Sequence, residues 1–217
     1  MNELATEQRA EWLKQRQKGI GGSDASAIVG CNPYKSNIET WQEKTGRIEP
    51  EDISHKLYVK YGLEAEQYLI ALFALDYPLY KVVANTNYTV HHHPKYPFIA
   101  GTLDAELIEV ETERKGILEV KTTNILQSMQ REKWNDQIPM NYYIQCLHYL
   151  LATGWEFVIL KAQLKTDYDG DIRLNTRHYH IERADVQEDL DYLLEKEIKF
   201  WEYVVNDRKP PLVLPPL

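Results

Sequence analysis

The order of the apolar patterns along the chain constrains its fold more than any other feature of the sequence. Residues 1–75 carry apolar groups at helical spacing, interrupted by glycines. Residues 79–123 contain three runs rich in β-branched side chains, bounded by charged or proline-containing turns. Helical spacing then returns, two strand-like runs follow, and a last helical pattern ends at Val205. This order predicts an α/β or α+β fold in which helices flank one mixed central sheet.

Breakers and capping residues set the expected boundaries of these elements. We expect helices at 6–18, from Ser23 or Asp24 to Gly30, from Ser36 or Asn37 to Gly46, and at 54–75, 125–134, 141–152 and 185–205. The expected strands span 80–90, 98–110, 115–123, 156–165 and 176–183. The charged connection ETERKG predicts that the second and third strands form an antiparallel hairpin.

Length and composition favour one domain without a membrane span. At 217 residues the chain is long enough for one compact core but short for two. We expect a helical part at 1–75, a sheet-containing core at 79–205 and a proline-rich, non-helical tail at 208–217. No apolar run is long enough to cross a bilayer, and the N-terminus does not resemble a secretion signal. Cys31 and Cys146 lack the spacing of a metal or disulfide framework, which favours a cytoplasmic location.

The net charge of −8 is unusual for a protein that binds DNA, because DNA binding depends on Lys and Arg that neutralise phosphates. Taken alone, this charge favours a metabolic enzyme. A nuclease nevertheless needs local carboxylates for a metal ion and only a local basic lining, so the total charge does not exclude one.

A carboxylate and an amine are expected side by side in the run ILEVKTT. Glu119 and Lys121 are two positions apart in a strand, so their side chains should share a face. Asp104 lies in the preceding predicted strand, and on paired strands the three groups would converge. Two carboxylates can hold Mg²⁺, and a lysine can orient the attacking water, which suits phosphodiester hydrolysis. The alternative for the Glu-Lys pair alone is an ordinary solvated strand face.

Two polar residues on predicted helices are candidates for supporting roles. Glu66, in the helix 54–75, could reach the metal directly or through a water, although it could equally belong to a polar helix face. Gln145 lies among apolar residues at helical spacing, so its amide needs a partner such as phosphate or backbone. The alternative is a satisfied core glutamine.

Arg16 and Ser23 flank the turn KGIGG, whose glycines lead into the next helix. Amides exposed at that helix start could hold a phosphate, although the pattern by itself favours a simple turn and N-cap. The segment GIGGSDAS lacks the Gly-Lys-Ser/Thr ending of a nucleotide-binding loop.

Taken together, these motifs resemble the YqaJ-type viral recombinase family, relatives of phage lambda exonuclease within the PD-(D/E)XK nuclease superfamily. The resemblance rests on an ordered set of segments: RQKGIGGSDASAIVGCNPYKS, TWQEKTG, GLEAEQYLIALF, HPKYPFIAGTLDAEL, LEVKTTN and IPMNYYIQCLHYLLATG. It implies a restriction-endonuclease-like core with a mixed sheet.

The resemblance also implies roles for individual residues. Asp104 and Glu119 would bind catalytic Mg²⁺, or Mn²⁺ in its place, together with the Val120 carbonyl. Lys121 would position the attacking water. The remaining implied roles are support of the metal site by Glu66, a place near the scissile phosphate for Gln145, and contact with the terminal 5′-phosphate by Arg16 and Ser23.

The sequence departs from the family pattern at a few places. Leu147 replaces a common second glutamine, and Ala105 replaces the glycine that usually follows the aspartate. A basic contact expected after the lysine strand is absent, because Gln127 and Ser128 occupy that region. Arg131 or Lys133 would have to replace it.

The function implied is 5′-to-3′ degradation of one strand of linear duplex DNA, which leaves 3′ single-stranded tails for recombination. The expected partners are DNA ends, a single-strand annealing protein and further copies of the chain in a trimeric ring. Such a ring could gather basic residues on an inner lining. The source would be a phage or a prophage in a bacterial cytoplasm. An endonuclease of the same superfamily and a non-catalytic module that binds DNA ends are the alternatives.

Overall fold

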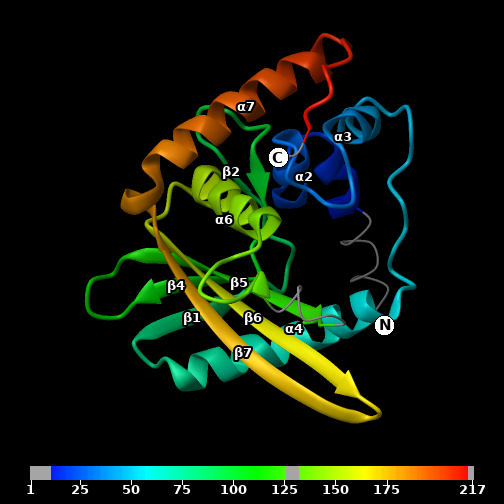
Figure 1. The fold of residues 1–217 in the computed structure, drawn as a ribbon. Helices are drawn as coiled ribbons and strands as arrows, with labels where there is room; N and C mark the ends of the chain where they lie inside the picture. The colour runs from blue at the N-terminus through cyan, green and yellow to red at the C-terminus, as the bar shows by residue number, and fades with distance from the viewer. Residues whose placement is uncertain (1–10, 126–131, 215–217) are drawn as a thin grey trace.

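The central feature of the computed structural model, which describes residues 11–125 and 132–214, is a five-stranded mixed sheet (Figure 1). Its strands lie in the order β1-β4-β5-β6-β7, and only β5 and β6 are parallel. The bounds are Tyr80–Ala84 for β1, Ala105–Glu109 for β4, Lys115–Asn124 for β5, Phe157–Tyr168 for β6 and Asp171–Glu182 for β7. The predicted mixed sheet with flanking helices and the predicted hairpin, now β4 and β5, are confirmed.

Helices cover both faces of this sheet (Figure 1). One face carries α4, and the other carries α6, which links the parallel strands β5 and β6 as a crossover connection. Outside α6 lie α2, α3 and α7. The bounds are Gly22–Ile28 for α2, Asn37–Lys44 for α3, Leu57–Asp76 for α4, Met140–Thr153 for α6 and Gln187–Val205 for α7, which follows a 3-10 turn at Arg183–Val186.

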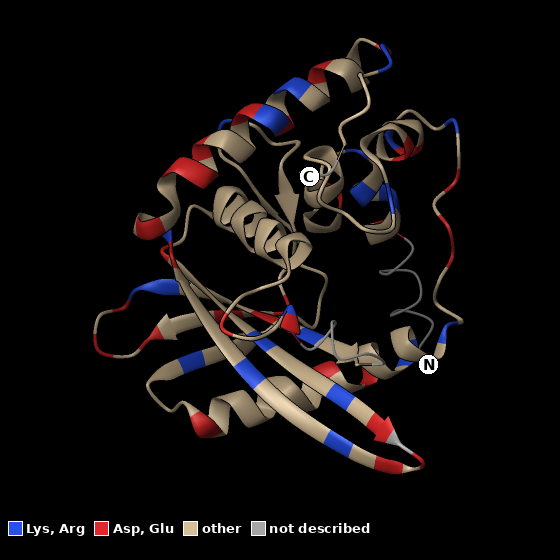
Figure 2. Cartoon of the chain, viewed as in Figure 1, with Lys and Arg blue, Asp and Glu red and all other residues tan. Residues whose placement is uncertain are grey.

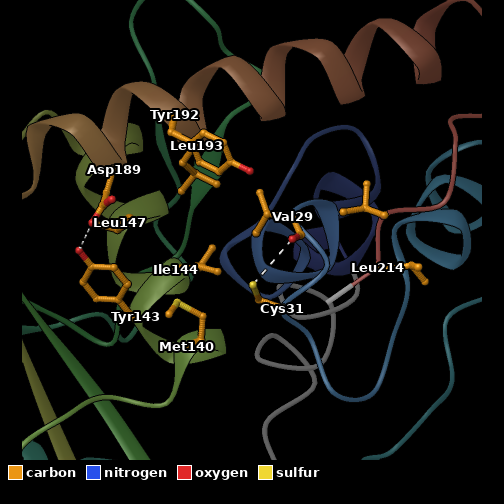
Figure 3. A pocket seen from close by; sticks show the side chains of 11 residues that line it. Val29, Cys31, Met140, Tyr143, Ile144, Leu147, Asp189, Tyr192, Leu193 and Leu214 are labelled. Carbon is orange, nitrogen blue, oxygen red and sulfur yellow. Dashed lines mark hydrogen bonds between the residues drawn. The ribbon is translucent and has the colours of Figure 1, made fainter. Parts of the chain in front are cut away.

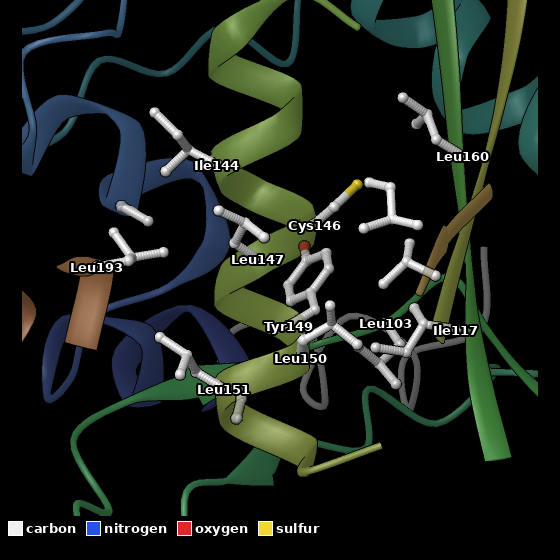
Figure 4. Close-up of a cluster of buried hydrophobic side chains, with 14 of the residues drawn as sticks. Leu103, Ile117, Ile144, Cys146, Leu147, Tyr149, Leu150, Leu151, Leu160 and Leu193 are labelled. Atoms are coloured by element: carbon white, nitrogen blue, oxygen red, sulfur yellow. The ribbon is translucent and has the colours of Figure 1, made fainter. Parts of the chain in front are cut away.

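Three apolar clusters hold these layers together, and the smallest joins the helices outside α6 through Ile28, Trp41 and Phe200. The largest one surrounds α6, since it includes Ile117 and Leu160 on the sheet side and Leu193 of α7 on the other side (Figure 4). The remaining one lies under α4 and includes Phe73 and Leu118. Because β5 contributes side chains to the largest cluster and to the one under α4, it is buried on both faces, as its nearly continuous apolar run ILEV indicates.

The predicted strand at 98–110 is interrupted. Ala100–Gly101 forms β3, which pairs with β2 at His91–His92 in a separate two-stranded sheet, and β4 begins only at Ala105. Gly101 lies so close to the Tyr149 ring that a Cβ atom there would be 2.8 Å from it. Asp104 therefore lies in the bend before β4 and not in a strand, which corrects the prediction.

The start of α2 also differs from the prediction. The N-cap is Gly21, and neither Ser23 nor Asp24 has that position. Asp24 lies inside the first turn, where its carboxylate accepts a hydrogen bond of 3.0 Å from the Gly21 amide. By contrast, Ser36 caps α3 as expected, with its hydroxyl accepting from the Glu39 amide.

The segment after α7 has no helix as far as residue 214, and it packs on its own chain. The Asn37 amide donates to the Pro211 carbonyl at 2.8 Å and accepts from the Val213 amide at 3.0 Å. The predicted helix at 125–134 falls mostly on 126–131, outside the described residues. In the part of the chain that is described, no helix is both long and apolar enough to cross a membrane.

Candidate active site

The candidate site begins where β5 runs beyond the end of β4. Ala105, the first residue of β4, pairs with Leu118, so β4 offers no partner to the next residues of β5. Asp104 occupies this open edge, and its Oδ2 accepts a hydrogen bond of 2.7 Å from the Val120 amide. The carboxylate thus replaces the missing strand as the partner of the β5 backbone.

Glu119 and Lys121 extend from the same face of β5, as their spacing predicted. The Lys121 ammonium donates to Glu119 Oε1, and the Gln145 side-chain amide on α6 donates to the same oxygen at 3.0 Å. Only 1% of the Glu119 side chain is exposed. Its second oxygen, Oε2, is buried and has no hydrogen-bond partner among the described residues.

The acids of the site influence one another's protonation. Burial, followed by the charge of Asp104, raises the pKa of Glu119 to about 8 and the pKa of Glu66 on α4 to about 7. Burial also raises the pKa of Asp104, against the influence of Lys121. Burial alone would lower the pKa of Lys121, but Glu119 and Asp104 outweigh it and raise that pKa. Burial therefore disfavours full ionisation of the three carboxyl groups in the absence of a bound cation.

These residues fit a magnesium site that leaves positions for water and substrate better than a site completed by protein ligands alone. Within residues 11–125 and 132–214, no three His, Cys, Asp or Glu side chains are placed so that they could hold a metal ion by themselves. Magnesium is, however, usually held by one or two carboxylates, with waters and substrate phosphates as further ligands. Glu119 Oε2, buried and unpartnered beside Asp104, has the chemistry of such a ligand.

Tyr149 was not singled out from the sequence, although it lies one helical turn after Gln145 on the same face of α6. Its hydroxyl accepts a hydrogen bond of 2.8 Å from the Gln145 amide. Its ring packs against α2 so closely that a Cβ atom on Gly22 would be 2.7 Å from it. Tyr149 thus connects Gln145, and through it Glu119, to the start of α2.

The structure brings Arg16 and Ser23 together near this helix start. The Arg16 guanidinium donates to the Ser23 hydroxyl at 3.0 Å and lies over the Trp12 ring at 4.7 Å. Lys44, which sequence reasoning missed, donates to the Arg16 carbonyl at 2.8 Å and pairs with buried Asp24 at 2.7 Å. These contacts tie the helix at 11–17 to α2 and α3.

Of Arg131 and Lys133, the two residues expected to replace the missing basic contact, only Lys133 lies within the described part of the chain. Gln127, Ser128 and Arg131 lie outside the described residues. Lys133 is exposed.

An apolar groove of about 310 Å³ lies on the other side of α6 (Figure 3). Tyr143, Ile144 and Leu147 line it from α6, together with residues of the turn after α2, of α7 and of the segment after α7. Gln145 and Tyr149 are on the opposite helix face, toward the sheet. The groove is therefore separate from the candidate active site.

Comparisons with known proteins agree with this fold. Residues 11–156 match the family model of the YqaJ-like viral recombinase domain. The uncharacterized protein YqaJ from Bacillus subtilis (strain 168) is 34% identical over 206 residues, which are 94% of this chain. The match spans only 59% of that relative's length.

Two solved structures share the fold at low sequence identity. The alkaline exonuclease LHK-Exo from Laribacter hongkongensis is 15% identical, with a TM-score of 0.60 over 91% of this chain and 97% of that one. A phage related exonuclease from Haemophilus somnus 129PT is 16% identical, with a TM-score of 0.56 over 87% and 96%. The predicted PD-(D/E)XK-like fold class is thus confirmed.

Proposed function

This chain belongs to the family of YqaJ-like viral recombinase domains, as its motifs indicated, and on that basis we propose that it is a metal-dependent DNA exonuclease. The observation that carries the proposal is Glu119 Oε2, a buried carboxylate oxygen without a partner among the described residues, close to a second acid and a lysine. A buried unpaired acceptor is costly unless a ligand satisfies it. The fold that this chain shares with two exonuclease structures supports the proposal.

Asp104, Glu119 and the Val120 carbonyl would hold Mg²⁺ or Mn²⁺, with Glu66 in support. The Val120 carbonyl belongs to the same open strand edge as its amide, which Asp104 binds. The bound ion would polarise the phosphate and lower the pKa of a water. Lys121 would orient that water and offset charge that develops on the phosphate. Gln145 would hold Glu119 Oε1 in place beside the scissile phosphate.

The direction of degradation rests on the Arg16 and Ser23 pair. A guanidinium beside a hydroxyl at the start of α2 is suited to a terminal phosphate. Tyr149 and Gln145 connect the start of α2 to Glu119. We therefore propose 5′-to-3′ degradation, which produces 3′ tails that a single-strand annealing protein could use in recombination.

Purified protein incubated with linear and circular duplex DNA tests the proposal. With Mg²⁺ we expect loss of linear DNA, with nucleotides released from a 5′ label before a 3′ label, and no reaction in EDTA. Cleavage of the circle would instead indicate an endonuclease. Binding of ends without cleavage under any metal condition would indicate a non-catalytic module.

In Arg16→Ala the ratio of the rates on 5′-phosphorylated and 5′-hydroxyl ends is expected to fall by about tenfold or more. This is the usual effect of a lost charged hydrogen bond. Rates on the two kinds of end, measured under single-turnover conditions, give this preference. Gln17→Ala is the matched control, because Gln17 is exposed on the same helix next to Arg16. An Arg16→Ala protein with an unchanged preference would leave Arg16 with only its packing on Trp12 and α2.

We also propose that three copies form a ring, as the resemblance implies. The chain has a net charge of −8, so a monomer would be repelled by DNA at long range. Lys14, Arg16 and Lys18 are exposed close together, and a ring could turn them toward one channel. Light scattering should give about three times the chain mass of 25.5 kDa. A monomer that degrades long DNA processively would contradict the ring.

A further inference from the structure

A row of side chains crosses the sheet at the level of the candidate active site. Lys121 on β5 pairs with Ala162 on β6, and Ala162 pairs with Arg177 on β7. Paired residues of neighbouring strands share a face, so Arg177 extends from the same face as Lys121 and Glu119. The Cα atoms of Lys121 and Arg177 should be about 10 Å apart, because neighbouring strands are about 4.8 Å apart. Ala162 between them has too short a side chain to separate them.

Besides Glu119 Oε2, two polar atoms on this face have no hydrogen-bond partner within the described part of the chain. They are the Arg177 Nε and the Thr123 Oγ1, and both atoms are buried. Thr123 follows Lys121 by two positions in β5, so it belongs to the same face. Buried donors are nearly always satisfied in folded proteins, so an unpaired guanidinium nitrogen and an unpaired hydroxyl beside a candidate active site point to a missing ligand.

The basic residues of β6 and β7 differ in what they contact. Figure 2 shows Lys and Arg at intervals along both strands. Lys161 and Lys165 face α4, where their ammonium groups lie 5.8 Å from the Phe73 ring and 4.7 Å from the Tyr61 ring. On the α6 face, Arg173 pairs with Asp171 near the hairpin tip. Among the described basic residues of these two strands, Arg177 is the one without an ion pair or ring contact.

The wall beside Arg177 is aromatic. Tyr179, the next residue of β7 on the same face, lies 6.0 Å from the Trp134 ring, which stacks on Tyr142 at 5.5 Å. The Lys121 ammonium lies 5.6 Å from the Tyr142 ring. The Lys121 ammonium and Tyr179, the neighbour of Arg177 on β7, thus contact the same group of aromatic rings.

We propose that Arg177 and Thr123 bind the sugar-phosphate backbone of the DNA strand that enters the active site. Both groups lack a hydrogen-bond acceptor. A phosphodiester supplies one, because a guanidinium and a hydroxyl can each donate to its oxygens. This inference rests on the proposed nuclease function. It adds a contact that positions the substrate at a distance from the metal ligands.

DNA binding without cleavage tests it. The fluorescence anisotropy of a labelled linear duplex is followed in EDTA at several NaCl concentrations. Loss of one phosphate contact should make the slope of log K against log salt less steep by about 0.9. We expect this change in Arg177→Met, with binding weakened several-fold, and a wild-type slope in Arg177→Lys, which keeps the charge. Arg173→Met is the control, because Arg173 lies on the same face of β7 but is already paired with Asp171.

Thr123→Val supplies an independent measurement, because it changes only the hydroxyl to a methyl group. We expect weaker binding with an unchanged slope and a melting temperature equal to or above that of the wild type, since an unpaired buried hydroxyl is lost. Wild-type slope and affinity in both Arg177→Met and Thr123→Val would overturn the inference. Failure of the wild-type protein to bind DNA at any salt concentration would instead contradict the proposed function itself.

Discussion

Glu119→Gln, Asp104→Asn and Lys121→Met are each expected to lose Mg²⁺-dependent cleavage of linear duplex DNA by about 10³-fold or more. The first two remove the charge of a proposed metal ligand at nearly constant shape, and such ligands contribute several kcal/mol to the stabilisation of the transition state. The third removes the ammonium beside Glu119 and keeps the aliphatic stem. Initial rates with excess enzyme on a 5′-labelled duplex measure the loss.

Two glutamates on α4 provide the comparison for these variants. Glu66 lies within electrostatic range of Asp104 and Lys121, so Glu66→Gln should reduce the rate by about tenfold through weaker support of the metal. Glu64 is exposed two positions earlier, and Glu64→Gln should leave the rate unchanged. A folded Glu119→Gln or Lys121→Met protein with near wild-type rates would show that the chemistry takes place elsewhere.

Glu66→Gln is also expected to stabilise the metal-free protein at neutral and alkaline pH. Burial and Asp104 raise the folded-state pKa of Glu66 to about 7, above its ordinary value of 4.5. Between these values the folded state binds a proton that the unfolded state releases, so the stability of the wild type falls as pH rises. Glutamine does not ionise and removes this loss. Because Glu66 is partly exposed, solvent screening reduces the gain to about 2–4 °C in melting temperature.

The pH profile separates this electrostatic gain from a change in packing. In EDTA the difference between Glu66→Gln and wild type should be absent at pH 4, grow between pH 4.5 and 7, and level off at higher pH. With saturating Mg²⁺ at pH 8 it should shrink, because metal bound to the folded wild type offsets the repulsion. Differential scanning calorimetry at these pH values, with Glu64→Gln alongside, measures it. A gain that is constant with pH would indicate packing.

Some of this organisation follows from the sequence alone, because it depends on spacing within a single element. The two-residue period of a strand places Glu119 and Lys121 on one face whatever the rest of the chain does. In the same way, helical spacing places Gln145 among the apolar residues of α6, and the short charged connection after Glu109 makes β4 and β5 a hairpin. The order of these elements was enough to predict the mixed sheet.

Only the tertiary structure decided how the groups meet. Asp104 reaches the Val120 amide because the chain bends between β3 and β4, just before β4 begins at Ala105. Arg177 comes level with Lys121 through the register of three strands. The positions of glycines, the registers of paired strands and the packing of elements distant in sequence determine such contacts. Local spacing carries no information on them, because it describes each element without its neighbours.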